Sequence, residues 1–329
     1  MELPPRRRVL AEIISLSYIA IIAVVANATG AFYVLFPELG ALSHDVFTRP
    51  RGTWANSPLM VAITPVITGA LGIVITNLLP YGFGSVLLNT IGAIAIVLGL
   101  RSPVAPAISA GLLPLVLGVT SWWYPPGIMF GTVLLAALSI PWKRYASREE
   151  PLIVESAEEL AEDITHEVAA PVPLRWEKIA ALIAFVAVGV LAVKLTGWRF
   201  ILFPPLVVIG FEMFLHPDVC PWAKRPLMLP VACFLTALGG FVFWRFLGVT
   251  PLTAALCMGW GIIVLRALDL HVPPALAVAI LPLVMDHPTL VYPIAVGLGT
   301  LLLTVWFFVC ERTLADIAPA VVEPGSHSG

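Results

Sequence analysis

The chain has 329 residues, of which 59% are hydrophobic and 12% are charged, and its mean hydropathy is +0.97. Soluble domains carry roughly a quarter of their residues as charged side chains, so this composition excludes an ordinary water-soluble protein. The formal net charge of −2 points to no macromolecular partner, and we expect no nucleic-acid binding. The composition predicts an all-α, polytopic membrane protein that has the lipid bilayer as its partner.

The first apolar segment follows a run of three arginines and ends near "ANA", a pattern that also fits a cleaved signal peptide. Residues 8–30 recur inside the chain at 175–197, where Thr196-Gly197 matches Thr29-Gly30. A signal peptidase would not remove an internal segment, so we predict that the first segment is a retained helix.

Four short apolar segments, 36–47, 103–118, 203–215 and 272–286, each begin with proline. Proline at the first helical position sacrifices no hydrogen bond, so these prolines predict helix starts. Segments of about 12 to 15 residues give roughly 18–23 Å of helix, which is too short for a full membrane core. A helix that starts at depth leaves first-turn amides unpaired beside protein or water, a device that transporters use. We therefore expect unpaired amides that face a polar route.

This interpretation assigns a solute pathway to residues at the four helix starts. They are Phe36, Pro37, Gly40, Ser102, Pro103, Pro106, Phe203, Pro204, Pro205, His271, Pro273 and Pro274. His271 precedes a helix start, where it can bind an anion, shuttle protons or simply cap the helix, and these alternatives stay open.

Two acids, Asp45 and Glu212, occupy matching positions late in the first and third short segments. Acids inside a membrane often bind cations or carry coupling protons. The simpler interpretation, which we favour from sequence, places them at the cytoplasmic interface beside Arg49 and Lys224. Glu38 ranks lower as a candidate because proline stands at the matching position of the second half.

Between the two apolar regions lies an acidic stretch, 143–174, which reads as an amphipathic cytosolic linker helix. The domains predicted around it are a first membrane repeat at 1–142, a second membrane repeat at 175–312 and a flexible tail at 313–329.

Sequence matches at a shift of 168 residues relate the two membrane regions. "TWANSPLM" at 53–60 returns as "PWAKRPLM" at 221–228, and "LPLV" at 113–116 returns at 281–284. Chance explains matched tryptophans and prolines in one register poorly. We predict a helix bundle of two tandem homologous halves.

The distribution of basic residues predicts the topology. Long apolar runs such as 13–25 and 294–309 fit membrane spans. If the short segments also cross, each half makes about six passes and only Lys194, Arg199 and Arg245 of the 18 basic residues lie outside. If the short segments re-enter instead, the bias vanishes, because six residues move outside: Arg49, Arg51, Arg101, Lys224, Arg225 and Arg266. We predict crossing, with both termini cytoplasmic in a cell or inner membrane.

The proline-led motifs carry a family resemblance. "FPPL" at 203–206, followed one helix pair later by "HVPP" at 271–274, resembles the HPP family of integral membrane proteins, and the first half resembles a diverged copy. Val272 interrupts the His-Pro-Pro motif of that family. The resemblance implies transport of a small inorganic anion such as nitrite.

A transporter or channel for a small polar solute is the function that the sequence favours. The alternatives are proton- or cation-coupled transport through Asp45 and Glu212, or a non-transporting scaffold or enzyme. We expect no enzyme, because no nucleophile–base pair or metal cluster is visible in the sequence. We also expect no cofactor and no metal, a small ion as substrate and a homodimer as a candidate assembly.

Overall fold

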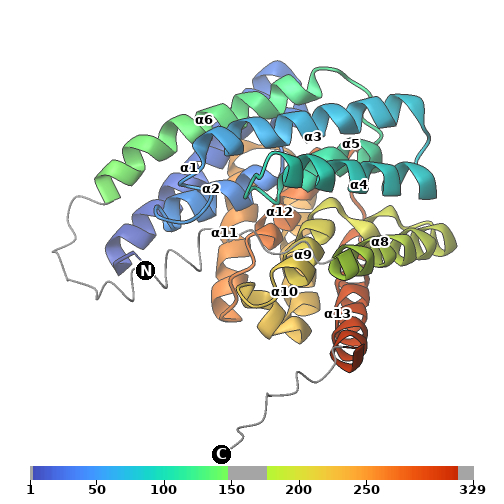
Figure 1. Cartoon of the computed structure of the whole chain (residues 1–329). Coiled ribbons are helices and arrows are strands. Elements are labelled where there is room, and N and C mark those ends of the chain that lie inside the picture. Colours follow the sequence, from blue (N-terminus) through green and yellow to red (C-terminus); the bar gives the residue numbers. More distant parts are fainter. Residues whose placement is uncertain (1–2, 147–175, 318–329) are drawn as a thin grey trace, which may run out of the picture.

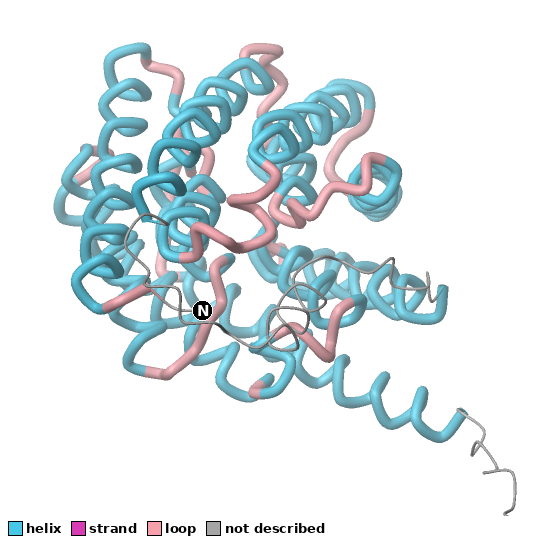
Figure 2. The backbone as a smooth tube through the Cα atoms, turned by 60° about the vertical axis from the view of Figure 1, so that its left-hand side comes forward, coloured by secondary structure: helices cyan, strands magenta, loops and turns pink. Residues whose placement is uncertain are grey.

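The computed structural model of the chain describes residues 3–146 and 176–317, and within them every regular element is a helix (Figure 2). The expected linker helix falls outside the described residues from residue 147 onward, and the tail does so from residue 318. Helix α6 continues to Ala146 and helix α13 to Ile317, past the expected boundaries at 142 and 312.

The first half, up to residue 146, contains six α-helices. They are α1 (Pro5–Thr29), α2 (Glu38–Thr48), α3 (Pro58–Leu78), α4 (Phe83–Gly99), α5 (Ala107–Leu117) and α6 (Tyr124–Ala146), with a short 3₁₀ turn η1 (Phe32–Val34) ahead of α2.

The second half, from residue 176, repeats this order of elements. It contains α8 (Trp176–Thr196), η2 (Arg199–Leu202), α9 (Pro204–Leu215), η3 (Pro221–Lys224), η4 (Pro226–Met228), α10 (Leu229–Leu247), α11 (Pro251–Ala267), α12 (Pro274–Ile280), η5 (Leu281–Val284) and α13 (Val291–Ile317).

Six helices of the described chain are long and apolar enough to cross a membrane: α1, α3, α6, α8, α10 with its preceding turn, and α13. Their outer faces carry exposed large apolar side chains at helical spacing, such as Ile294, Leu298, Leu301 and Val305 on α13. Water does not favour such continuous apolar faces, whereas lipid does. These features indicate an integral membrane protein.

Individual contacts recur at the shift of 168 residues. The Tyr124 hydroxyl donates to the carbonyl of Ala110 at 2.9 Å, and the Tyr292 hydroxyl donates to that of Val278 at 2.6 Å. Helices α4 and α11 have matching bounds at the same shift. The two halves therefore share local packing as well as the order of their elements.

Two glycines allow close contacts between long and short α-helices of the bundle. A Cβ atom at Gly72 of α3 would overlap the carbonyl of Gly111 in α5, and one at Gly240 of α10 would overlap that of Ala279 in α12. Both pairs again differ by 168 residues. Small residues at such crossings let two backbones touch, as is common between membrane helices.

The first helix of each half packs against the other half. Helix α1 packs against α11 of the second half, and α8 packs against α4 of the first half. Figure 1 shows α8 running across the view beside α4, while α10, α11 and α13 run mostly down it. Likewise α2 packs on α12 and α9 packs on α5. Each contact has its reciprocal, which is the pattern of an isologous interface.

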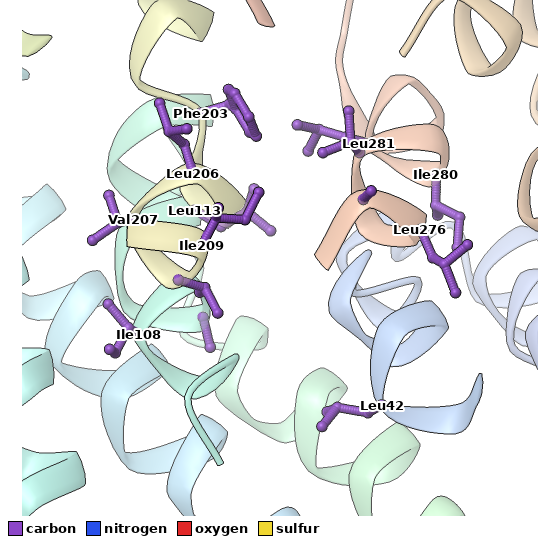
Figure 3. Packing of buried hydrophobic residues seen from close by; sticks show 14 of the residues in the cluster. Leu42, Ile108, Leu113, Phe203, Leu206, Val207, Ile209, Leu276, Ile280 and Leu281 are labelled. Carbon is purple, nitrogen blue, oxygen red and sulfur yellow. The ribbon is translucent and has the colours of Figure 1, made fainter. Parts of the chain in front are cut away.

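The short helices α2, α5, α9 and α12 form the centre of the bundle. Their starts lie at or directly after prolines, as predicted. Figure 3 shows Leu206 and Ile209 of α9 beside Ile108 and Leu113 of α5, with Leu276 of α12 next to α2. Apolar side chains therefore fill the space between these helices.

The expectation of unpaired first-turn amides was wrong. The amides of Leu39 and Gly40 donate to the carbonyls of Phe36 and Pro37 at 2.9 and 3.0 Å. The amide of Leu276 likewise donates to Pro273 at 3.0 Å. A 3₁₀ turn at the start of each short helix gives these amides a local hydrogen-bond acceptor. They are therefore not free to bind a solute, contrary to the expectation from the sequence.

Contacts between chain segments define two opposite ends of the bundle. At the basic end, Arg7 donates to the carbonyl of Ala146 at 2.7 Å, and Lys143 bonds to Asn56. The Trp54 indole donates to the carbonyl of Pro103 at 2.9 Å at this end.

At the other end of the bundle, contacts join the C-terminal ends of α1 and α3 and the nearby loops. Asn27 donates to the carbonyl of Val249 at 3.1 Å, Asn77 donates to that of Thr120 at 3.0 Å, and Arg199 lies 4.9 Å from the Tyr81 ring centre. The two short segments of the first half therefore run from one end of the bundle to the other.

Candidate functional site

The most polar contact between the halves lies at the basic end, around Asp45. Its Oδ1 atom is 3.4 Å from Nε2 of His271, which precedes α12, and 3.4 Å from Nη1 of Arg49. Asp45 is 4% exposed, and the His271 side chain is 37% exposed. Asp45 and His271 lie at ion-pair distance but form no hydrogen bond, and Nε2 of His271 is left without a hydrogen-bond partner. A buried acid thus faces the buried Nε2 atom of a half-buried imidazole from the other half.

A second ion pair across the halves lies beside the first. Glu12 of α1 accepts from Nη2 of Arg266, at the end of α11, at 2.5 Å and lies 3.8 Å from Nε of Arg8. One helical turn further along α1, the Ser15 hydroxyl donates to the carbonyl of Ser43 in α2 at 3.3 Å. We call Glu12, Asp45, Arg266 and His271 the inter-half cluster, because its partners come from both halves.

The matching acid of the second half has a different environment. Glu212 is half-buried, and its Oε2 atom lies 3.0 Å from Nδ1 of His216 on the same helix end. This hydrogen bond raises the pKa of His216 above its ordinary value, against a smaller opposing effect of burial. Glu212 therefore makes a local contact, whereas Asp45 joins two halves.

The sequence-predicted pathway residues come together at the centre, but they pack against apolar groups. All of them are buried except Pro103 and His271, which are half-buried. Phe36 and Phe203 are fully buried, and a Cβ atom at Gly40 would overlap the side chain of Ile280. The expected polar route between the helix starts is therefore closed in this conformation.

Glu38, which ranks lower from sequence, is the most deeply buried acid among the described residues. It lies in the first turn of α2, is 1% exposed, and its Oε1 atom accepts from the hydroxyl of Ser109 in the first turn of α5. Its Oε2 atom is buried and has no hydrogen-bond partner. The available signal was an acid directly after the helix-starting proline of a short intramembrane segment.

Hydroxyl groups of α3 and of the segment from Ser102 to Ser109, which we call the hydroxyl row, lie at intervals between this acid and the basic end. Thr64 donates to Ser102 at 2.8 Å, and Thr68, one turn further, donates to the carbonyl of Ala107 at 2.6 Å. Ser109 follows two residues after Ala107. Ser102, at 9% exposed, is the member closest to solvent.

Comparisons of this chain with protein families, with curated proteins and with solved structures found no match. The resemblance to the HPP family therefore stays a prediction from the motifs at 203–206 and 271–274.

Proposed function

We propose that this chain is a membrane transporter for a small polar solute, coupled to proton or cation movement through Asp45. The observation that supports it best is the contact between Asp45 of α2 and His271 of the other half. An ionisable pair between two bodies changes its strength when they move or when a proton binds, so it can link ion binding to a conformational change. A small inorganic anion such as nitrite is the first candidate substrate, on the motif resemblance alone.

Apolar packing at the centre favours a transporter over an open channel. An open pore needs a continuous wetted path, whereas the residues between α2, α5, α9 and α12 are mostly buried apolar side chains. A transporter exposes its solute site to one side at a time, and a closed centre fits such a cycle.

The proposal includes two tandem homologous halves with about six passes each. Its support is the recurrence of the tyrosine hydrogen bonds and of the glycine contacts at one shift. The basic end carries Arg7 and Lys143 together with Arg266, so we place that end and both termini in the cytoplasm.

Nitrite uptake into proteoliposomes, with and without an inward proton gradient, tests this function. We expect uptake above that of empty liposomes, stimulated by the gradient in the wild type. Asp45→Asn should lose at least about tenfold of the stimulated rate, which corresponds to about 1.4 kcal/mol of coupling. Asp218→Asn, at an exposed acid outside the inter-half cluster, is the matched control.

Two outcomes would contradict the proposal. Absence of flux for nitrite, nitrate and related ions would favour a scaffold. An unchanged gradient response in Asp45→Asn would instead support the interfacial interpretation of this acid.

A further inference from the structure

Glu38 occupies an unusual place, because the first turns of two short helices meet at its carboxyl group. Helices α2 and α5 each have 11 residues, Glu38 is the first residue of α2, and Ser109 lies in the first turn of α5. One carboxyl oxygen accepts from Ser109, and the other is buried without a partner. Buried polar atoms are nearly always hydrogen-bonded, so the free oxygen marks a site with an unused binding capacity.

The second half has nothing comparable at the matching positions. Apart from Thr68, which matches Thr236, the polar residues of the first half that surround or lead to the site have apolar counterparts. Glu38, Ser109, Asn89, Ser102 and Thr64 correspond to Pro205, Ala277, Cys257, Leu270 and Ala232. Since the backbone packing recurs in both halves, the polar groups are not needed to build the fold.

Two opposing physical effects act on the Glu38 carboxyl group. Burial without a cationic partner favours the neutral acid, and none of the ion pairs found among residues 3–146 and 176–317 includes Glu38. The N-terminal dipoles of α2 and α5 favour the carboxylate. A group held between these effects can exist in both protonation states.

We propose that Glu38 is a proton-binding site at the centre of the bundle, reached from the basic end along the hydroxyl row. A proton from solvent binds the free Oε2 atom and converts the carboxylate to the carboxylic acid, and the reverse step returns the proton to water. This inference deepens the proposed function, on which it rests for the link between protonation and solute movement.

Other titratable groups lie near Glu38 and around α2. Tyr124 of α6 and Tyr292 of α13 lie within electrostatic reach of Glu38, and both phenols donate to backbone carbonyls. The further titratable or charged groups near α2 are, by element, Arg8, Glu12 and Tyr18 of α1, His44 and Asp45 of α2, Arg49 at its end, Arg266 of α11 and His271 ahead of α12.

A proton fits the site better than a metal cation. Hard cations take about six oxygen ligands, whereas the side-chain oxygens that meet here are those of Glu38 and Ser109. Within the described residues, no group of three or more histidine, cysteine, aspartate or glutamate side chains gathers to hold a metal.

Infrared difference spectroscopy of the purified full-length protein tests proton binding without any transport. We expect the carbonyl stretch of a buried carboxylic acid to change between about pH 5 and about pH 9. Glu38→Gln should remove this band, while Glu177→Gln, at an exposed acid, should keep it. Ser109→Ala, which keeps the acid but loses its donor, should shift the band.

Three results would overturn the inference. They are a pH-dependent band that survives Glu38→Gln, the absence of any such band in the wild type, or a band that responds to sodium at constant pH.

Transport measurements then link the site to function. Glu38→Gln should lose the stimulation of nitrite uptake by a proton gradient but keep nitrite exchange at equal pH. Retained stimulation would overturn the coupling role. If the wild type moves neither nitrite nor nitrate nor related ions, the proposed function fails, and the infrared experiment still decides whether Glu38 binds a proton.

Discussion

At the scale of single residues, two buried tyrosine hydroxyls tie the long helices α6 and α13 to the short helices α5 and α12. Removing either hydroxyl leaves a buried carbonyl without its donor. We expect Tyr124→Phe and Tyr292→Phe each to lower the free energy of unfolding by about 1–2 kcal/mol. Thermal unfolding in detergent measures this effect, with Tyr33→Phe as the control at a half-buried tyrosine. Unchanged melting of both variants would contradict a structural role for the bonds.

His216 predicts a pH dependence of stability. Its pKa is raised in the folded protein by the hydrogen bond to Glu212, so protonation stabilises the fold. This contribution is complete below the ordinary imidazole pKa of about 6.5 and is lost as pH rises through the raised value. The melting-temperature difference between wild type and His216→Gln should therefore be largest at acid pH and shrink on alkalinisation. Glu212→Gln should flatten the same profile, and a difference that grows with pH would contradict the assignment.

The sequence indicates which residues are polar, but it does not indicate which residues they contact. Asp45 and His271 were both candidates, yet their contact depends on α2 packing against α12, which no local pattern encodes. Glu38 ranked lower from sequence because proline stands at the matching position of the second half, and its contact with Ser109 depends on how the first turns of α2 and α5 meet.

At the scale of helices, close contact between α3 and α5 and between α10 and α12 depends on glycine. Gly72→Ala and Gly240→Ala place a methyl group against a backbone carbonyl, which cannot yield as a flexible side chain does. We expect each to cost about 1–3 kcal/mol or more. Gly84→Ala and Gly99→Ala, where a methyl group meets open space, should be neutral or slightly stabilising. Equal melting temperatures for both sets would contradict the close approach.

Helix starts were predictable because proline restricts the backbone locally. Helices α9 and α12 begin at Pro204 and Pro274, as the proline positions indicate. The state of the first-turn amides was not predictable in this way. The 3₁₀ turn at the start of each short helix depends on how neighbouring helices hold the residues there, so the unpaired-amide hypothesis failed at this step.

At the scale of the whole molecule, the two ends of the bundle predict which residues face which side of a membrane. In a chain with its four cysteines replaced, Lys224→Cys at the basic end should react with an impermeant maleimide only from the cytoplasmic side. Leu195→Cys, at a 78% exposed position near the other end, should react only from the opposite side. Labelling of both from one side would contradict crossing by the short segments.

The exchanged packing of α1 and α8 has a consequence for the history of such a chain. Since α1 covers α11 and α8 covers α4, a lone half would present a bare apolar flank that a second identical half could shield. If the chain arose by the proposed duplication, joining both copies in one polypeptide allowed their sequences to diverge at the centre of the bundle. One copy could then carry a buried acid at Glu38 while the other carries Pro205 at the matching position.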